Sequence, residues 1–442
     1  MSKIMGLKEK IENKKAVVGI IGLGYVGLPL AMVFSGGGYE VLGFDVDEDK
    51  VSSLGAGKSY IHYIPSGIIR DAVKRKRFSA TSDFSQLKEP DAVIICVPTP
   101  LGEHREPDLS YVVDTTKAVA ARLRKGQLVV LESTTYPGTT DEVMLPLLEA
   151  TGLKLGRDFF LAYSPEREDP GNPKYSTSQI PKVVAGVDKK SGELASLLYG
   201  NVFGSIVPVS SARAAEAVKL TENIFRAVNI ALVNEMKMIY ARFGIDIWEV
   251  IEAAKTKPFG FMPFYPGPGL GGHCIPIDPF YLTWKARELD CPTRFIELAG
   301  EINTDMPNYV VNVLVNALNE RNMAAKGSRV LVLGLAYKKD VADVRESPSF
   351  SVIRKLKSLG ARVEYSDPFV PAIPHMRHYP EMRGMKSVKL DAGNLAKFTA
   401  SIILTDHTGV DYEFVVAHSK LVVDTRNATR KVIKHRDRII MA

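Results

Sequence analysis

Short apolar runs alternate with helical patterns of apolar and polar positions through the first half of the chain. This alternation predicts parallel strands joined by helices that cover both faces of a sheet. The strands that we expect there are residues 16–21, 41–44, 92–97, 128–132, 159–163 and 182–185.

The pattern changes near Ser211. Residues 212–244 contain no proline and only a terminal glycine, which favours one long helix followed by further helical sequence. A second α/β region begins near Ser328, where an apolar run meets Gly334. Its expected elements are a strand from Arg329, strands at 361–365, 400–405 and 420–423, and a proline-rich loop at 367–380.

Composition agrees with a globular chain of several domains. A chain of 442 residues is too long for one core, so we expect two or three domains. The net charge of +7 suits an anionic small-molecule substrate, and no basic block interleaved with aromatic residues indicates nucleic acid. The cysteines Cys96, Cys274 and Cys291 are widely spaced, which argues against a disulfide scaffold and for a reducing, cytoplasmic location.

Residues 16–34 carry no charge, so a membrane span or a signal segment has to be considered. The stretch divides into a β-like half, a glycine turn and a helix with Pro29 near its start. A strand, a turn and a helix account for every residue. We therefore expect no membrane segment.

The turn Gly22-Leu-Gly24-Tyr-Val-Gly27 follows a predicted strand and opens a helical pattern. The first glycine permits the tight turn, the second permits close approach of a pyrophosphate, and the third lets the helix pack on the strand. Asp45 ends the second strand, where a carboxylate can accept hydrogen bonds from ribose hydroxyls and repels a 2′-phosphate. Asp45 alone could be a turn residue, but together the two features predict an NAD site.

Two later strand ends fall where a doubly wound sheet binds its ligand. One carries Pro98 and Thr99, and the other carries Thr134 within Glu132-Ser-Thr-Thr. Their hydroxyls could contact cofactor or substrate, or they could cap helices; spacing alone leaves both interpretations open.

Cys274 lies in the glycine-dense loop Gly267–Pro279, where a ligand can approach the backbone. A cysteine framed in this way is a candidate nucleophile, although a buried, packed thiol is the commoner case. Asp278, which precedes Pro279, is equally a candidate helix cap and a candidate catalytic carboxylate. The adjacent His273 is badly placed to pair with Cys274, and Cys96 and His104 offer no metal-ligand spacing.

Lys219, Asn223 and Arg226 share one face of the long helix. An amine, an amide and a guanidinium suit an oxyanion and an anionic substrate. The alternative, which spacing favours, is a polar surface stripe with Glu216 and Glu222 as ion partners.

Seven motifs follow one another along nearly the whole chain: Gly22-x-Gly-Tyr-Val-Gly27-Leu-Pro, Ser133-Thr134, Ser164-Pro-Glu166-Arg167, Glu216-x-x-Lys219-x-x-Glu-Asn223, Gly271-Gly-x-Cys274-x-x-x-Asp278, Gly334-Leu-Ala-Tyr-Lys338 and Asp343-x-Arg345-Glu-Ser. In this order they resemble the UDP-glucose/GDP-mannose dehydrogenase family of nucleotide-sugar 6-dehydrogenases. The resemblance implies an α/β protein with two Rossmann-like doubly wound domains joined by a helical middle domain with one long central helix. The implied domains are 1–208 for NAD, 209–310 for dimerisation and the cysteine loop, and 311–442 for the nucleotide sugar.

The resemblance also implies a four-electron oxidation of a sugar C6 alcohol to the uronic acid, through a thiohemiacetal and a thioester on Cys274. The implied catalytic residues are Cys274, Lys219, Asn223, Asp278, Glu166 and Thr134. The implied NAD contacts are Gly22, Gly24, Tyr25, Val26, Gly27, Asp45, Pro98, Thr99, Thr134 and Arg345. The implied substrate contacts are Glu166, Arg167, Lys219, Asn223, Arg226, Tyr265, Gly267, Gly271, Lys338 and Arg426.

The chain departs from the UDP-glucose dehydrogenases proper, because Pro170 stands where they carry a second glutamate and Lys257 stands near the place of an arginine. The loop 163–172 and the segment Gly272-His273-Cys274-Ile-Pro276 resemble the branch that acts on UDP-N-acetylhexosamines. Within it UDP-N-acetylglucosamine ranks first, then UDP-N-acetylgalactosamine and UDP-N-acetylmannosamine, with UDP-glucose as a further alternative. The implied product serves surface polysaccharide synthesis of the bacterial type, such as lipopolysaccharide O-antigen.

Other classes remain open at this stage. A two-electron 3-hydroxyacid dehydrogenase or a sugar epimerase would share the N-terminal site without needing Cys274, and a non-catalytic NAD-binding protein would retain the polar residues by coincidence. The family typically dimerises through its helical middle, so a homodimer or a larger homo-oligomer is expected.

Overall fold

The computed structural model describes residues 2–61, 63–102, 106–167, 177–272, 275–376 and 378–442. The chain forms two compact units. The first unit comprises Met1–Glu222 and Phe280–Cys291, and the second comprises Asn223–Pro279 and Pro292–Ala442. The long helix α8 (Ala212–Arg242) runs from the first into the second.

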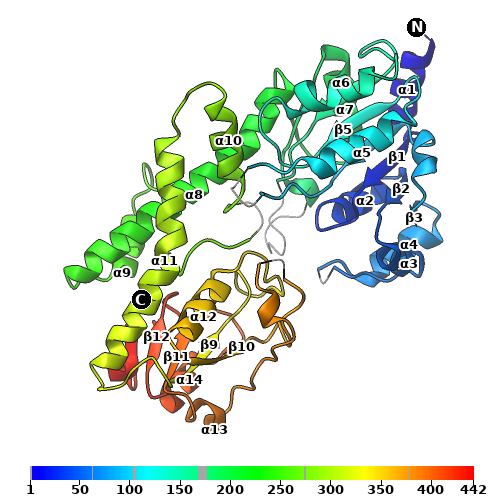
Figure 1. Cartoon of the computed structure of the whole chain (residues 1–442). Coiled ribbons are helices and arrows are strands. Elements are labelled where there is room, and N and C mark those ends of the chain that lie inside the picture. Colours follow the sequence, from blue (N-terminus) through cyan, green and yellow to red (C-terminus); the bar gives the residue numbers. More distant parts are fainter. Residues whose placement is uncertain (1, 62, 103–105, 168–176, 273–274, 377) are drawn as a thin grey trace. The chain divides into compact units, whose positions relative to one another are not determined.

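The first unit is built on an eight-stranded sheet with the order β3-β2-β1-β4-β5-β6-β7-β8. The chain fills one side of β1 with β2 and β3, and then returns to fill the other side from β4 onward (Figure 1). This reversal between β1 and β4 is the switch point at which doubly wound sheets bind their ligands. The strands are β1 (Val17–Ile21), β2 (Glu40–Phe44), β3 (Phe78–Thr81), β4 (Ala92–Ile95), β5 (Leu128–Leu131), β6 (Phe160–Tyr163), β7 (Lys182–Gly186) and β8 (Ile206–Pro208).

Helices cover both faces of this sheet. Ile20 and Ile94 pack with helices on one face, while their neighbours Ile21 and Ile95 pack on the other, as strand alternation requires. The first face carries α1 (Ser2–Glu12), α2 (Gly27–Gly36), α3 (Glu48–Gly55), α4 (Ser66–Lys74) and α7 (Lys189–Gly200). The second face carries α5 (Ser110–Ala120), α6 (Leu145–Glu149) and the start of α8.

Two strands at one end of the sheet depart from the expected parallel arrangement, because β7 pairs antiparallel to β6, with Tyr163 opposite Ala185, and β8 pairs parallel to β7. A parallel return needs a crossover of a dozen or more residues that is usually helical. The described part of this connection holds only a 3₁₀ turn, Thr177–Gln179. As a result, β7 begins at the sheet edge where β4, β5 and β6 end.

The second unit contains a five-stranded parallel sheet with the order β10-β9-β11-β12-β13. Its strands are β9 (Arg329–Leu333), β10 (Arg362–Ser366), β11 (Ala400–Ile403), β12 (Val422–Asp424) and β13 (Ile439–Met441). The remaining helices are α9 (Ile247–Ala254), α10 (Asp278–Arg287, mostly in the first unit), α11 (Arg294–Asn319), α12 (Pro348–Ser358), α13 (Ala392–Leu395) and α14 (Tyr412–His418). Helices α11 and α12 pack on one face of the sheet, and α13 and α14 on the other.

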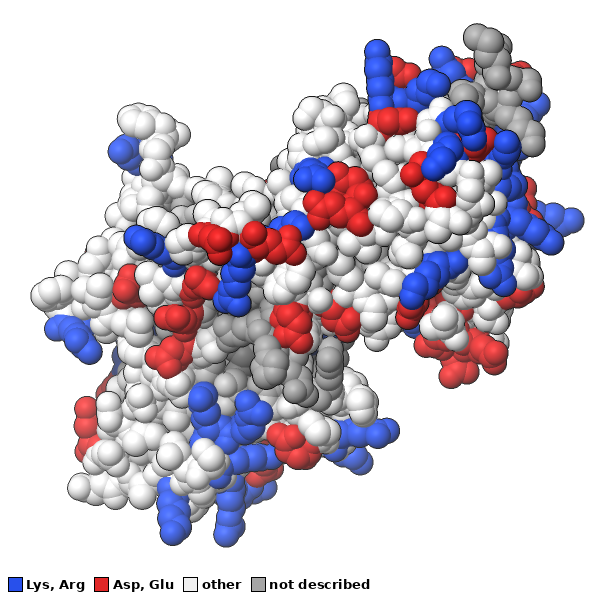
Figure 2. Space-filling model, turned by 45° about the horizontal axis from the view of Figure 1, so that its top comes forward, with Lys and Arg blue, Asp and Glu red and all other residues white. Residues whose placement is uncertain are grey.

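The expected fold class is confirmed: two doubly wound α/β sheets and a helical middle that contains one long helix. On the face shown in Figure 2, lysine and arginine side chains are interspersed with aspartate and glutamate. Among the described helices, none combines the length and the apolar character needed to cross a membrane.

Candidate active site

The glycine turn after β1 has the backbone that its sequence predicts. Gly22 has φ +89°, and a Cβ there would lie 2.4 Å from the Cys96 carbonyl oxygen. A Cβ on Gly27 would lie 1.8 Å from the Gly22 oxygen, so α2 can approach the turn only without a side chain. A Cβ on Gly24 would meet nothing within 4 Å, which leaves open space above the turn. Turn and helix terminus together fit a pyrophosphate.

Asp45 is buried directly after β2, and its carboxylate is fixed beside this turn. It accepts hydrogen bonds from the Leu23 N–H at 2.9 Å and the Asp47 N–H at 3.0 Å, and Lys50 lies 3.5 Å away. Asp45 therefore does more than turn the chain, because it ties the end of β2 to the glycine turn. A 2′-phosphate at this position would meet a negative charge, so the site fits NAD better than NADP.

Replacing Asp45 with alanine is expected to weaken NAD binding about 10- to 100-fold, the loss that follows when hydrogen bonds to a charged group disappear. Discrimination against NADP should fall because the repelling carboxylate is gone. Fluorescence titration with both cofactors measures this. Asp83→Ala is the matched control, since Asp83 makes a similar turn after β3; an equal loss in that variant would refute the assignment of Asp45.

Two tyrosines that the sequence analysis did not predict also form hydrogen bonds with the glycine turn after β1. The Tyr60 hydroxyl donates to the Leu23 carbonyl at 2.5 Å, and the Tyr63 hydroxyl donates to the Tyr25 carbonyl at 3.2 Å. Burial, together with the charges of Asp45 and Asp47, raises the pKa of Tyr60, so its phenol stays a donor. No spacing rule marks these residues, which lie more than thirty positions from the turn.

The ends of β4 and β5 are joined by Ser133. Its hydroxyl donates to the Val97 carbonyl at 2.7 Å and accepts from the Val97 N–H at 3.0 Å, so it links strands rather than capping a helix. Thr134 is partly exposed beside it. Pro98 is exposed, and the Thr99 carbonyl accepts a hydrogen bond from Tyr281 at 2.9 Å. Contacts of these residues with a ligand remain predictions.

A cluster of four charges lies at the same edge of the sheet, and we call it the charge cluster: Glu132, Lys182 and Lys219, which are buried, and Glu166, whose side chain is 15% exposed. The Glu166 carboxylate lies 3.5 Å from Lys219, and Glu132 lies 2.8 Å from Lys182. Burial raises the pKa of Glu166, although Lys219 and Lys182 oppose the shift. A carboxyl group with a raised pKa is suited to proton transfer near neutral pH.

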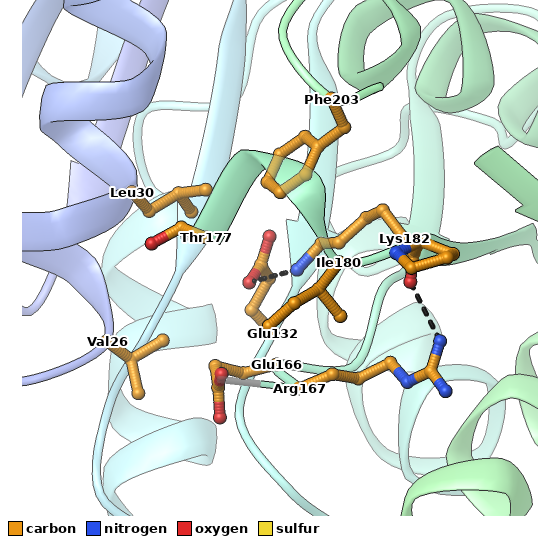
Figure 3. Close-up of a pocket in the computed structure, with 10 residues that line it drawn as sticks. Val26, Leu30, Glu132, Glu166, Arg167, Thr177, Ile180, Lys182 and Phe203 are labelled. Carbon is orange, nitrogen blue, oxygen red and sulfur yellow. Dashed lines mark hydrogen bonds and ion pairs between the residues drawn. The ribbon is translucent and has the colours of Figure 1, made fainter. Parts of the chain in front are cut away.

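Figure 3 shows the hollow beside this cluster, about 330 Å³ counting the solvent at its mouth. Val26, Leu30 and Phe203 supply apolar walls, and Glu132 and Lys182 supply charge. Arg167 also lines it, donating to the Pro181 carbonyl at 2.7 Å and pairing with Glu222 at 2.5 Å. Val26 and Leu30 belong to the entry of α2, so the hollow adjoins the glycine turn.

The polar face of α8 is not a surface stripe, since Lys219 and Asn223 are both buried. Glu216 is no partner of Lys219. Its carboxylate instead accepts the N–H groups of Gly138 and Thr140 at 2.6 and 2.9 Å. Burial raises the pKa of Glu216 to about 7 despite these donors. The interpretation that spacing favoured is therefore wrong for Lys219 and Asn223.

In the second unit, Asn223 is fixed from both sides. Its amide nitrogen donates to the Asp278 carboxylate, and Arg226 donates to its amide oxygen. Asp278 is buried and is the first residue of α10, so it combines a helix start with a side-chain contact to Asn223. The amide therefore has a single orientation, which suits a hydrogen-bond donor to a reacting oxygen.

The described part of the glycine-dense loop packs against the C-terminal sheet domain. A Cβ on Gly267 would lie 2.5 Å from Arg426, and one on Gly271 would lie 2.7 Å from the Tyr337 side chain. The Gly267 N–H donates to Asn234 at 3.0 Å. Cys274 and His273, and with them the predicted nucleophile, lie outside the described residues.

Three other residues of the second unit that were predicted to contact substrate or cofactor have side-chain partners within the protein. Lys338 lies over the Tyr337 ring, and Arg345 forms a bidentate ion pair with both carboxylate oxygens of Asp343. Tyr265 donates to Glu252 at 2.8 Å and stacks on Trp248. Their ligand contacts stay predictions.

The second sheet repeats the geometry of the glycine turn. Gly334 has φ +84°, and the Leu335 N–H donates to Asp367, which directly follows β10, at 2.7 Å. Here the carboxylate meets a histidine: His407 Nδ1 accepts the Asp340 N–H at 3.0 Å, so Nε2 carries the proton that is shared with Asp367, also at 3.0 Å. Burial opposes ionisation, but these hydrogen bonds lower the pKa of Asp367.

Three family models match the chain, and their residues cover most of it. The NAD binding domain of the UDP-glucose/GDP-mannose dehydrogenase family matches residues 16–203, the central domain 213–305 and the UDP binding domain 331–431. The chain belongs to this family. It is therefore an NAD-dependent nucleotide-sugar dehydrogenase.

Relatives within the family differ in the sugar that their names specify. A UDP-N-acetyl-D-glucosamine 6-dehydrogenase of Pseudomonas aeruginosa is 39% identical over 368 residues, 83% of this chain and 86% of that protein. A UDP-N-acetyl-D-mannosamine dehydrogenase of Pyrococcus horikoshii is 33% identical over 94% of this chain and 96% of that protein. Among solved structures, a UDP-D-ManNAc dehydrogenase of Pyrococcus horikoshii superposes with a TM-score of 0.86 at 33% identity, covering 96% of this chain and 98% of that one.

Proposed function

We propose that the protein oxidises the C6 alcohol of UDP-N-acetylglucosamine to the uronic acid, and that Cys274 carries the intermediates. The observation that carries the proposal is the pairing of buried Lys219 with Glu166 at 3.5 Å, next to the glycine turn's hollow. A simple alcohol dehydrogenation needs a group that accepts the proton of the alcohol. A mostly buried carboxyl group with a raised pKa beside a lysine suits a further, hydrolytic step.

In the first oxidation the hydroxyl proton passes to water and a hydride leaves the C6 carbon, so the alcohol becomes an aldehyde. Lys219 and Asn223 donate hydrogen bonds to the C6 oxygen, where negative charge develops, and Asp278 keeps the Asn223 amide oriented. NAD, when bound, would supply the hydride acceptor for both oxidations, and Gly22, Gly24, Gly27 and Asp45 would hold it.

The Cys274 sulfur then adds to the aldehyde carbon, and the resulting thiohemiacetal is oxidised to a thioester. Water attacks the thioester carbon, the C–S bond breaks, and the thiolate leaves. Glu166 takes a proton from that water, and Thr134 helps to orient it. The covalent bond retains the sugar while the spent cofactor is exchanged.

The substrate assignment rests on the glucosamine-specific names of relatives at 36–39% identity and on the loop 163–172. UDP-N-acetylmannosamine moves ahead of UDP-N-acetylgalactosamine as the second candidate, because relatives named for it cover more of this chain. The proposal includes the domain division 1–208, 209–310 and 311–442, a homodimer or larger assembly, a cytoplasmic location and a role in surface polysaccharide synthesis.

Counting the NADH formed per sugar tests the reaction and the substrate together. Each reaction is run to completion on UDP-N-acetylglucosamine, its galacto and manno epimers, and UDP-glucose. We expect two NADH per sugar and an acidic product, with UDP-N-acetylglucosamine giving the highest kcat/KM. One NADH per sugar on every substrate would exclude the thioester mechanism. A higher kcat/KM for another epimer would change the substrate assignment to that epimer.

A further inference from the structure

The strand reversal at β7 brings a lysine to the edge of the sheet that carries the proposed chemistry. Lys182 is the first residue of β7, and Glu132 directly follows β5. Had β7 run parallel to β6, its first residue would lie at the opposite edge. Instead Lys182 Nζ lies 2.8 Å from Glu132, and both side chains are almost fully buried.

This ion pair is tied to the turn that carries Glu166. Lys182 Nζ donates to the carbonyl of Pro165 at 3.2 Å, one residue before Glu166. The other oxygen of Glu132 accepts the Tyr199 hydroxyl at 2.5 Å, so α7 fixes the far side of the pair. The Lys182 ammonium also lies 5.3 Å and 5.5 Å from the ring centroids of Tyr199 and Phe203.

Neither residue is required to complete the nucleotide turn or to contact the sugar in the proposed reaction. A buried ion pair is weak as a source of stability, because desolvation offsets the attraction. Its contacts place it instead against the Pro165 carbonyl and beside the Glu166 carboxylate, on the wall of the hollow in Figure 3.

We propose that Glu132 and Lys182 are positioning residues for Glu166: Lys182 holds the Pro165 carbonyl and is itself held by Glu132, so that the Glu166 carboxylate stays beside Lys219. The inference rests on the proposed hydrolytic role of Glu166. The inference adds Glu132 and Lys182, to which the seven sequence motifs assign no role, and it adds their opposite electrostatic effects on Glu166.

The charge balance predicts opposite effects for the two partners. Among the described residues, the charged or titratable groups near Glu166 include Lys219 and Glu222 on α8, Lys182 on β7, Glu132 after β5, Cys96 after β4, Tyr199 on α7 and the adjacent Arg167. The Lys182 charge lowers the pKa of Glu166 and the Glu132 charge raises it. Removing the Lys182 charge should therefore raise the pKa of Glu166, and removing the Glu132 charge should lower it. Because the base must be ionised, the rising limb of the hydrolysis rate moves in the same direction as this pKa.

The experiment compares Lys182→Met, Glu132→Gln, their charge-neutral double variant and Lys182→Arg by stopped-flow NADH formation from pH 5.5 to 9. Slow hydrolysis appears as a burst of two NADH per site followed by a slow phase, with acyl-enzyme visible as added mass after acid quench. We expect Lys182→Met to slow the slow phase about tenfold or more and to shift its midpoint up by about one pH unit. Glu132→Gln should shift the midpoint down.

The double variant should regain the wild-type midpoint but stay slow, because the Pro165 carbonyl has lost its donor, and Lys182→Arg should recover much of the rate. NAD titration of each variant verifies folding. The control is Lys125→Met, which removes the ion pair between an exposed lysine and Asp158. The inference would be overturned if Lys182→Met and Glu132→Gln each kept the wild-type pH midpoint and the wild-type rate of the slow phase. Glu166→Gln tests the hydrolytic role of Glu166 separately from the positioning role of Glu132 and Lys182. If Glu166→Gln shows no burst of NADH followed by a slow phase, the proposed role of Glu166 is wrong.

Discussion

Cys274→Ala is expected to abolish formation of the uronic acid while NAD binds almost as tightly as in the unaltered protein. Without the sulfur no thiohemiacetal forms, so the second oxidation has no covalent substrate. The cofactor turn around Gly22 and Asp45 belongs to the first unit, and the residues flanking Cys274 on its N-terminal side belong to the second, so the cofactor contacts should persist. NADH absorbance and a titration with NAD measure the two quantities.

Cys291→Ala is the matched control, because Cys291 is an exposed thiol that the mechanism does not use. It should retain full activity. If Cys274→Ala turned over normally, the covalent route would be excluded and a simpler dehydrogenation would have to explain the family motifs.

Lys219→Met is expected to lower kcat about 10²- to 10³-fold, the range found when one donor to a developing oxyanion is removed. The loss should fall mainly on kcat rather than KM, since the interaction strengthens as charge develops on the C6 oxygen. The side chain is buried and of similar length, so packing along α8 is largely kept. Steady-state kinetics over a range of sugar concentrations separates the two constants.

Lys237→Met supplies a control on the same helix. Lys237 is equally buried, and burial lowers its pKa to about 7, opposed by Asp424. Methionine there removes a poorly solvated ammonium without touching the proposed chemistry, so kcat should stay within about threefold. Equal losses in both variants would mean that any buried lysine of α8 is needed for folding, and the catalytic assignment of Lys219 would fall.

The central strands could be predicted from the sequence because they are short, wholly apolar runs between helical patterns. β4, β5 and β6 are buried along their full length. Three strands escaped prediction: β3, β8 and β13. Each lies at a sheet edge and is short, with polar residues, a proline or exposed positions, so no full apolar run marks it.

The site was predictable only where its residues are neighbours in sequence. The turn Gly22–Gly27 and Asp45 follow from local geometry, whereas burial of Lys219 depends on what α8 packs against. Glu132 and Lys182 are 50 residues apart, and Glu132 and Tyr199 are 67 apart. They meet because the strand order places β5, β6 and β7 together, and the antiparallel direction of β7 has no signature in hydrophobic periodicity.

The second glycine turn bears on how many cofactors one chain can take up. Asp367 already receives the N–H groups of Leu335, Ala336, Phe369 and Val370 in addition to His407. A carboxylate offers about four lone-pair sites, so none is left for a ribose hydroxyl. This arrangement argues against a second NAD bound at Asp367, because His407 already occupies a position that a ribose hydroxyl would need.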